Sequence, residues 1–194
     1  PMVDSCRRRF GNRLANASFE VGDATAMRNF EANRFDFILF SFNGIDYVDQ
    51  EGRLKVFREV FRVGREGALF CFSSHNLLGI ERLNPLRRHL FFTLNPIWVI
   101  RPVVSWLRWM VRYRPRQSVQ ALRSAPYAVV NDGAYDNGLD TYYIQPREQL
   151  AQLKEWFTDT RVFGLESGRE LDIHSELDHA TDPWLYYLCR IRPK

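Results

Sequence analysis

The sequence predicts an α/β fold built on a largely parallel sheet, because two apolar runs flank one amphipathic stretch. Residues 35–40 and 68–72 are nearly continuous apolar runs, which is typical of strands covered on both faces. The stretch between them repeats apolar residues at helical spacing, so the three segments form one predicted strand–helix–strand unit. A polar loop, residues 41–44, follows the first strand, and open α/β sheets bind their ligands at such strand ends.

The segment before this unit predicts a helix and one short strand. The chain opens at Pro1 on a helical pattern, and no glycine-rich strand–helix turn precedes it. Phe19 and Val21 alternate with polar residues, so we expect a short strand there, ending in the acidic turn 22–24.

The stretch between the two apolar runs predicts a surface helix, since apolar and charged residues occupy opposite sides. The predicted buried stripe consists of Leu54, Val56, Phe57, Val60, Phe61 and Val63. The residues expected on the solvent side are Arg53, Lys55, Arg58, Glu59 and Arg62. Gly64 and Gly67 supply a turn before the second strand.

The C-terminal part predicts one more helix and two strands. Residues 147–157 form a helix with Leu150, Leu153 and Phe157 inward. Strands at 162–165 and 184–191 follow and close the sheet as an antiparallel hairpin. The acidic loop between them, 172–182, has metal-ligand residue types but no metal-site spacing, so we expect a solvated loop and no metal.

The net charge of +4 conceals a strongly basic segment. Residues 77–130 hold nine arginines and one glutamate, a net +8, which leaves −4 for the rest of the chain. This segment breaks the strand–helix alternation, so we interpret residues 77–140 as a cap inserted into a core of residues 1–76 and 141–194. The three cysteines, an odd number without metal spacing, indicate a reducing compartment and a cytoplasmic protein.

Two interpretations of the predicted helix at residues 102–113 stay open. Its polar residues fall on a single narrow stripe, and the rest of its surface is apolar. The helix either packs on the core and lines a hydrophobic substrate pocket, or residues 97–113 rest on an anionic membrane surface. A membrane span is excluded because Arg108 would lie inside a short segment.

Several short segments carry a family resemblance through their order and spacing. They are Gly22-Asp23-Ala24, Phe35-Asp36-Phe37, Ser41-Phe42-Asn43-Gly44, residues 141–146 and residues 182–187. This set resembles class I S-adenosylmethionine-dependent methyltransferases of the small-molecule type. The resemblance implies a Rossmann-like sheet with a cap inserted after its fifth strand, here residues 68–72, and a closing antiparallel hairpin. The family's glycine-rich cofactor loop would lie before residue 1, so the N-terminal part of the fold is expected to be missing.

The resemblance implies S-adenosyl-L-methionine as cofactor and assigns residues to it. Asp23 would accept a hydrogen bond from the adenine amine, and the backbone of Ala24 would contact the ring edge. Ser41, Phe42 and Asn43 would face the methionine part of the cofactor. Ordinary turn chemistry at Gly22-Asp23, and packing of the 41–43 loop, are the structural alternatives.

The acceptor side of the predicted site begins at the end of the second strand. His75 is a candidate base, because a histidine there could take a proton from a hydroxyl or amine. The alternative is that His75 hydrogen-bonds loop backbone. Asn76, Tyr142 and Tyr143 are the candidate substrate-binding residues.

The predicted function is methyl transfer from S-adenosylmethionine to a small acceptor that is hydrophobic or anionic. A non-catalytic fragment or degenerate relative that acts as a binding protein is the alternative from another class. A nucleic-acid methyltransferase is a weaker alternative. Residues 95–98 are similar to the tetrapeptide of base-amino methyltransferases, but they do not follow the strand that carries it in that group.

Overall fold

The computed structural model describes residues 2–11, 13–14, 16–83, 122, 124–132 and 139–194. The predicted helix at 102–113, its membrane interpretation and the tetrapeptide at 95–98 lie outside these residues. No helix within the described ranges is both long and apolar enough to cross a bilayer.

The described residues form one mixed sheet of seven strands. The strands are β1 (Phe35–Phe40), β2 (Gly64–Asn76), β3 (Tyr127–Val130), β4 (Thr141–Ile144), β5 (Phe157–Gly164), β6 (Glu170–Leu171) and β7 (Trp184–Ile191). Their order is β3-β4-β2-β7-β5-β6, and β1 also pairs with β2. β1 and β4 run parallel to β2, whereas β7 is antiparallel to both β2 and β5.

The long strand β2 has two partners along one edge. β7 pairs with residues 69–75 of β2, so β1 and β4 both occupy the opposite edge. β1 pairs as far as Phe72 and β4 begins at His75, which leaves Ser73 and Ser74 without a strand on that side. We call this gap the strand break.

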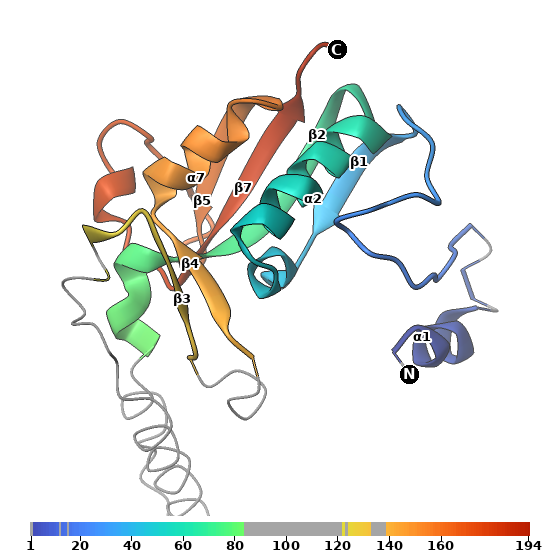
Figure 1. The fold of residues 1–194 in the computed structure, drawn as a ribbon, viewed down its shortest axis with the longest axis horizontal. Coiled ribbons are helices and arrows are strands. Elements are labelled where there is room, and N and C mark those ends of the chain that lie inside the picture. Colours follow the sequence, from blue (N-terminus) through green and yellow to red (C-terminus); the bar gives the residue numbers. More distant parts are fainter. Residues whose placement is uncertain (1, 12, 15, 84–121, 123, 133–138) are drawn as a thin grey trace, which may run out of the picture.

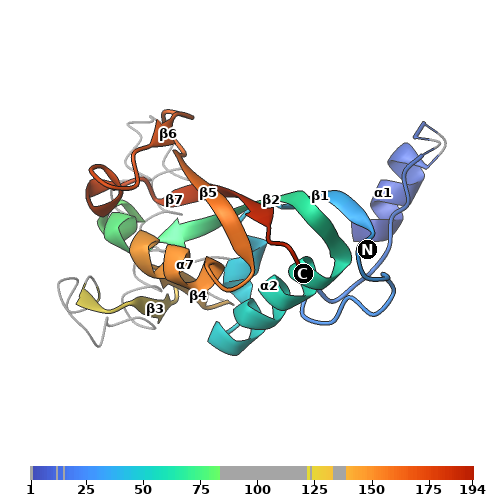
Figure 2. The same ribbon diagram turned by 90° about the horizontal axis from the view of Figure 1, so that it is seen from above.

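Helices cover one face of the sheet. The helices are α1 (Met2–Phe10), α2 (Gln50–Val63) and α7 (Pro146–Leu153), with short 3-10 helices η1 (Gly44–Tyr47), η2 (Leu77–Leu83) and η3 (Leu177–His179). α2 and α7 lie over the same face, and α1 lies apart from them, beyond β1 (Figures 1 and 2). The core therefore forms between this face of the sheet and the two helices.

Aromatic side chains fill that core. The Phe57 ring of α2 lies 5.6 Å from the Phe72 ring and 6.1 Å from the Phe157 ring. Phe70 stacks on Phe72 at 4.9 Å. Because side chains alternate along a strand, Phe70 and Phe72 face the helices and the odd-numbered residues of β2 face the other side.

Several predicted elements are confirmed. Val56, Phe57, Val60 and Val63 of α2 are buried, as the apolar stripe predicts. β7 spans residues 184–191, and its antiparallel pairing with β5 is the predicted closing hairpin.

The predicted strand at residues 19–21 is wrong. This segment has no strand partner in the described part of the chain, and Val21 is 78 % exposed. The carbonyl of Phe19 instead accepts a hydrogen bond from Arg7 Nε at 2.9 Å. Alternation alone cannot make a strand, because the backbone groups of a strand need a partner along the edge.

The second strand is longer than predicted at both ends. It begins at Gly64, so the expected turn is an irregular strand segment in which Gly67 has a φ of +77°. Its register shifts there, since Phe35 pairs with Gly64 and Phe37 with Leu69. At the other end, His75 and Asn76 lie within β2 instead of in a following loop.

Other boundaries differ by a few residues. α7 ends at Leu153, and Phe157 begins β5 instead of closing the helix. β3 lies inside the predicted cap, for which no strand was predicted because basic and aromatic residues interrupt the strand–helix alternation there.

The aromatic core gives a direct test of the packing. We expect Phe57→Ala to lower the free energy of unfolding by about 3–5 kcal/mol, because a large buried ring leaves a cavity. Phe37→Ala removes the same ring from β1, where it is 55 % exposed, and should cost less than about 1 kcal/mol. Urea unfolding followed by circular dichroism measures both, and equal losses would contradict the assigned core.

Candidate active site at the strand break

The chain leaves β1 through two residues in an unusual backbone conformation. Phe42 and Asn43 have φ of 56° and 53°, which is uncommon for residues other than glycine. The Asn43 amide donates to Ser73 Oγ at 2.9 Å and so fixes the turn to β2. Asn43 is buried by this turn, and the Phe42 side chain is 92 % exposed. The turn directs η1 into the strand break.

η1 places the carboxylate of Asp46 in the interior. Oδ1 pairs with Arg53 and accepts from Ser74 Oγ at 2.8 Å. Oδ2 accepts from the His75 backbone amide at 2.6 Å and lies 2.8 Å from His75 Nδ1. Ser74 and His75 are successive strand residues whose side chains face opposite sides of the sheet. The Asp46 carboxylate therefore connects the two faces through the strand break.

Arg53 holds this carboxylate from the helix face. Its guanidinium donates to Ile45 O at 3.2 Å, to Ser74 Oγ at 3.2 Å and to Gln149 Oε1 of α7 at 2.5 Å. The prediction that Arg53 faces solvent is wrong, since its side chain is fully buried. A helical pattern places arginine on the polar side by default, and only the buried partner Asp46 explains why it lies inside.

His75 lies at the centre of a row of side chains across three strands. It pairs in register with Tyr143 of β4 and Trp184 of β7, and their ring centroids lie 4.9 and 6.0 Å from its own. Its Nε2 lies 3.3 Å from Asn43 Nδ2. Asn43 Oδ1 is buried and has no hydrogen-bond partner among the described residues. The alternative prediction, that His75 bonds only loop backbone, does not describe these contacts.

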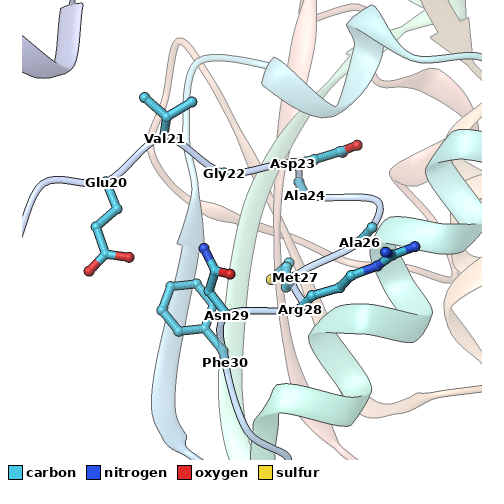
Figure 3. Close-up of a pocket in the computed structure, with 10 residues that line it drawn as sticks. All are labelled: Glu20, Val21, Gly22, Asp23, Ala24, Ala26, Met27, Arg28, Asn29 and Phe30. Carbon is cyan, nitrogen blue, oxygen red and sulfur yellow. The ribbon is translucent and has the colours of Figure 1, made fainter.

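A second part of the site lies around the acidic turn. Ten residues line a hollow of about 250 Å³ (Figure 3): Glu20, Val21, Gly22, Asp23, Ala24, Ala26, Met27, Arg28, Asn29 and Phe30. The Asp23 carboxylate extends away from the Asn29 and Phe30 side chains (Figure 3). Its Oδ1 accepts from the Thr25 amide at 2.8 Å and from Thr25 Oγ1 at 2.7 Å, and these bonds lower the pKa of Asp23.

An apolar groove leads from this hollow toward the strand break. Ala24, Met27 and Phe30 line the hollow and also a groove of about 340 Å³. The groove follows β1 from Phe35 to Phe40, and Ser41 comes directly after it. The groove thus extends from the hollow beside the acidic turn along β1, whose last residue precedes the 41–43 loop.

Comparison with known proteins relates one part of the chain to a family. Residues 1–67 match the family described as methyltransferase domain, so this part of the chain is similar to methyltransferase domains. No curated protein matches the sequence.

Solved structures show the same fold over the whole chain. A Pyrococcus horikoshii protein matches all of this chain with 67 % of its own length, at 16 % identity and a TM-score of 0.55. An S-adenosylmethionine-dependent methyltransferase from Clostridium acetobutylicum matches 99 % of the chain with 72 % of its own, at 14 % identity and a TM-score of 0.54. A Thermotoga maritima protein named as a possible histamine N-methyltransferase matches 97 % of the chain with 68 % of its own, at 14 % identity and a TM-score of 0.52. The predicted class I methyltransferase fold is confirmed.

The two tyrosines named as candidate substrate-binding residues, Tyr142 and Tyr143, are both buried. The Tyr142 ring stacks on Tyr127 at 5.1 Å, and the Arg53 guanidinium lies 4.4 Å from its centroid. Tyr143 is fully buried, and its hydroxyl donates to Asp132 Oδ2 at 2.7 Å. Burial raises the pKa of Tyr142 to about 12, and burial together with Asp132 raises the pKa of Tyr143 further. Both tyrosines pack against the buried network, Tyr143 against His75 and Tyr142 against Arg53.

The side chain of Asn76 forms hydrogen bonds with backbone groups on both sides of the end of β2. Its Nδ2 donates to Ala180 O at 2.7 Å and to Asp182 O at 3.0 Å, and its Oδ1 accepts from the Leu78 amide at 3.0 Å. These bonds fasten the 180–182 loop to the end of β2. The predicted substrate contact of Asn76 would have to displace at least one of them.

The acidic loop at residues 172–182 forms ion pairs with two arginines. Arg169 pairs with Glu176, and Arg147 holds Asp178 through two bonds of 2.8 Å. The bond from Arg169 lowers the pKa of Glu176 to about 2. Among the described residues, no group of three or more histidine, cysteine or acidic side chains could hold a metal ion.

Sequence reasoning found His75 but missed Asp46, Arg53 and Gln149. The one available signal is an acidic residue within the apolar surroundings of Ile45, Tyr47 and Val48, seven positions before Arg53. A lone carboxylate in such a segment requires a buried cationic partner. Gln149 gives no comparable signal, because a glutamine in a helix is ordinarily exposed.

The buried ion pair yields the next prediction. Arg53→Met should lower the free energy of unfolding by about 3–5 kcal/mol, because Asp46 would remain as an uncompensated buried charge. Lys55→Met, two residues along the same helix, breaks the exposed pair with Glu51 and should change it by no more than about 0.5 kcal/mol. Denaturant unfolding compares the two, and similar small effects would contradict the role assigned to Arg53.

The tyrosine at the same network gives a prediction for alkaline pH. The raised pKa of Tyr142, about 12, means that the folded state holds this proton more tightly than the unfolded chain, where tyrosine titrates near 10. Its contribution to stability is complete below about pH 10 and is lost as the pH rises through about 12. Urea unfolding between these values should therefore show a shallower decline for Tyr142→Phe than for the wild type.

Tyr186→Phe is the matched control for this titration, because it removes one hydroxyl from an exposed side chain of the same sheet. A decline that is unchanged in Tyr142→Phe would show that other groups carry the alkaline sensitivity.

Proposed function

We propose that this chain transfers a methyl group from S-adenosylmethionine to the oxygen or nitrogen of a small acceptor. The observation that carries the proposal is the contact of Asp46 with His75 at the strand break, where the parallel strands β1 and β2 end. It supports an acid–base group at the carboxyl ends of parallel strands, where α/β sheets bind their ligands.

The residues around the hollow fit the adenosyl end of this cofactor. Val21, Met27 and Phe30 offer apolar surfaces to a flat ring, and Asp23 lies at the rim. Oδ1 of Asp23 is engaged by Thr25, and Oδ2 accepts no hydrogen bond in the described part of the chain. Oδ2 is therefore the atom to which the adenine amine would donate. When bound, S-adenosylmethionine supplies an electrophilic methyl group on a sulfonium.

The 41–43 loop belongs to the same proposal. Phe40 is the last β1 residue that lines the groove, and the loop follows it directly, so Ser41, Phe42 and Asn43 would contact the part of the cofactor beyond the adenosine. Phe42 has a positive φ and an exposed ring, and such strain is found most often where a ligand is held.

His75 would act as the base for the acceptor. With Nδ1 donating to Asp46, the lone pair of Nε2 is the group that can take a proton from an acceptor hydroxyl or amine. Asn43 Nδ2 lies 3.3 Å from Nε2, which is longer than a usual N–H hydrogen bond, so an acceptor can replace it at small cost. The O–H or N–H bond of the acceptor breaks, and an Nε2–H bond forms.

The surroundings of His75 favour a small hydrophobic acceptor. Tyr143 and Trp184 flank the imidazole, and the charge of Asp46 is balanced by Arg53. A small compound with an apolar or aromatic body and one hydroxyl or amine group fits beside Tyr143 and Trp184 better than a strongly charged compound. An anionic acceptor would draw on the arginines of residues 77–130, which are the basis of that alternative.

Calorimetry tests the cofactor assignment. We expect S-adenosylmethionine to bind the protein and Asp23→Ala to weaken binding by roughly tenfold, because one polar contact is lost. Asp36→Ala is the matched control, since the Asp36 carboxylate of β1 pairs with Arg65 of β2. This variant should not change the affinity for S-adenosylmethionine. Equal affinity for wild type and Asp23→Ala would remove Asp23 from the site.

Turnover tests the transfer itself. Release of S-adenosylhomocysteine is measured with a panel of small phenols, alcohols and amines, and His75→Asn should slow it by roughly 10²–10⁴-fold. The cofactor affinity of this variant should stay unchanged. Cofactor binding without turnover on any acceptor would favour the non-catalytic binding role, and the absence of both would refute the proposal.

A further inference from the structure

We infer that Asp46 is a positioning residue that fixes the orientation and tautomer of His75, so that Nε2 is its free basic nitrogen. This inference rests on the proposed function, in which Nε2 receives the acceptor proton. It adds a residue that acts through His75 and would not itself contact the acceptor.

One carboxylate oxygen holds His75 at two points. Asp46 Oδ2 accepts from the His75 backbone amide at 2.6 Å and lies at hydrogen-bond distance, 2.8 Å, from ring Nδ1. Because both bonds meet at the same atom, the ring cannot rotate about its side-chain bonds without losing the Nδ1 bond. The direction of Nε2 toward Asn43 is thereby set.

The other oxygen of the carboxylate pairs with a buried guanidinium. Oδ1 receives the guanidinium of Arg53 and the hydroxyl of Ser74, so the negative charge is compensated inside the protein. An ionised carboxylate only accepts hydrogen bonds, so the proton in the contact with His75 has to reside on Nδ1. A neutral imidazole then carries its lone pair on Nε2.

The remaining neighbours of His75 do not compete for Nδ1. Tyr143 of β4 directs its hydroxyl to Asp132, and Trp184 of β7 meets the imidazole edge to face at 75°. Asn43 lies at Nε2. Asp46 is therefore the group that determines the tautomer, and Arg53 and Gln149 anchor it from two helices.

Long-range proton–nitrogen NMR spectra of the ¹⁵N-labelled chain test this directly, since they distinguish the two neutral tautomers of histidine. The chain has four histidines, and the signal lost in His75→Gln identifies the one in question. We expect the Nδ1–H tautomer in the wild type. In Asp46→Asn the new amide can donate to Nδ1, so the Nε2–H tautomer should appear.

Ser74→Ala is the matched control. It removes a hydrogen bond from the same carboxylate but leaves the contact with His75, so the Nδ1–H tautomer should remain. A change in Ser74→Ala as large as in Asp46→Asn would mean that loss of the network, and not the identity of residue 46, alters the ring.

The Nε2–H tautomer in the wild type would overturn the inference, and so would an unchanged Nδ1–H tautomer in a folded Asp46→Asn. Should that variant not fold, the wild-type spectrum alone decides between the two tautomers. None of these readings requires methyl transfer, so failure of the proposed function is distinguished from failure of the inference. Where turnover is measurable, Asp46→Asn should lower kcat by roughly 10²–10⁴-fold and leave cofactor affinity unchanged.

Discussion

The buried ion pair between Asp46 and Arg53 is the interaction on which the rest of the structure depends. It joins η1, α2, β2 and α7, four elements that contact one another where the parallel edge of the sheet is interrupted. Two charges withdrawn from water are tolerated because they pair with each other and because Ser74, Ile45 and Gln149 form hydrogen bonds with them. The candidate active site is thus also the joint that holds the helix layer to the sheet.

The strand break explains how Asp46 reaches both Ser74 and His75. From Leu69 to Phe72, β2 has a strand on each edge, so a side chain on one face has no access to the other. At Ser73 and Ser74 no described strand lies on the side of β1 and β4, and one carboxylate contacts groups on both faces. The sheet therefore brings Asp46 of η1 against His75 of β2 at a fixed place in the fold.

The sequence predicts those features that repeat locally and misses those set by distant partners. The buried stripe of α2 and the strand β7 follow from periodicity, and the fold class follows from the order of the elements. Arg53 was assigned to solvent because its partner lies in a different segment. His75 was found by its place after an apolar run, yet its tautomer and orientation depend on Asp46, which no local pattern connects to it.

The row of rings across β4, β2 and β7 contains a tryptophan, Trp184, whose fluorescence depends on its surroundings. The Trp184 indole lies 6.0 Å from the imidazole of His75, whereas Trp156 lies against Phe57 in the core on the helix face. Of these two tryptophans, Trp184 lies beside His75 and Trp156 lies in the core. The chain has five tryptophans, so a variant that keeps only Trp184 would isolate its emission as an optical report on the surroundings of His75.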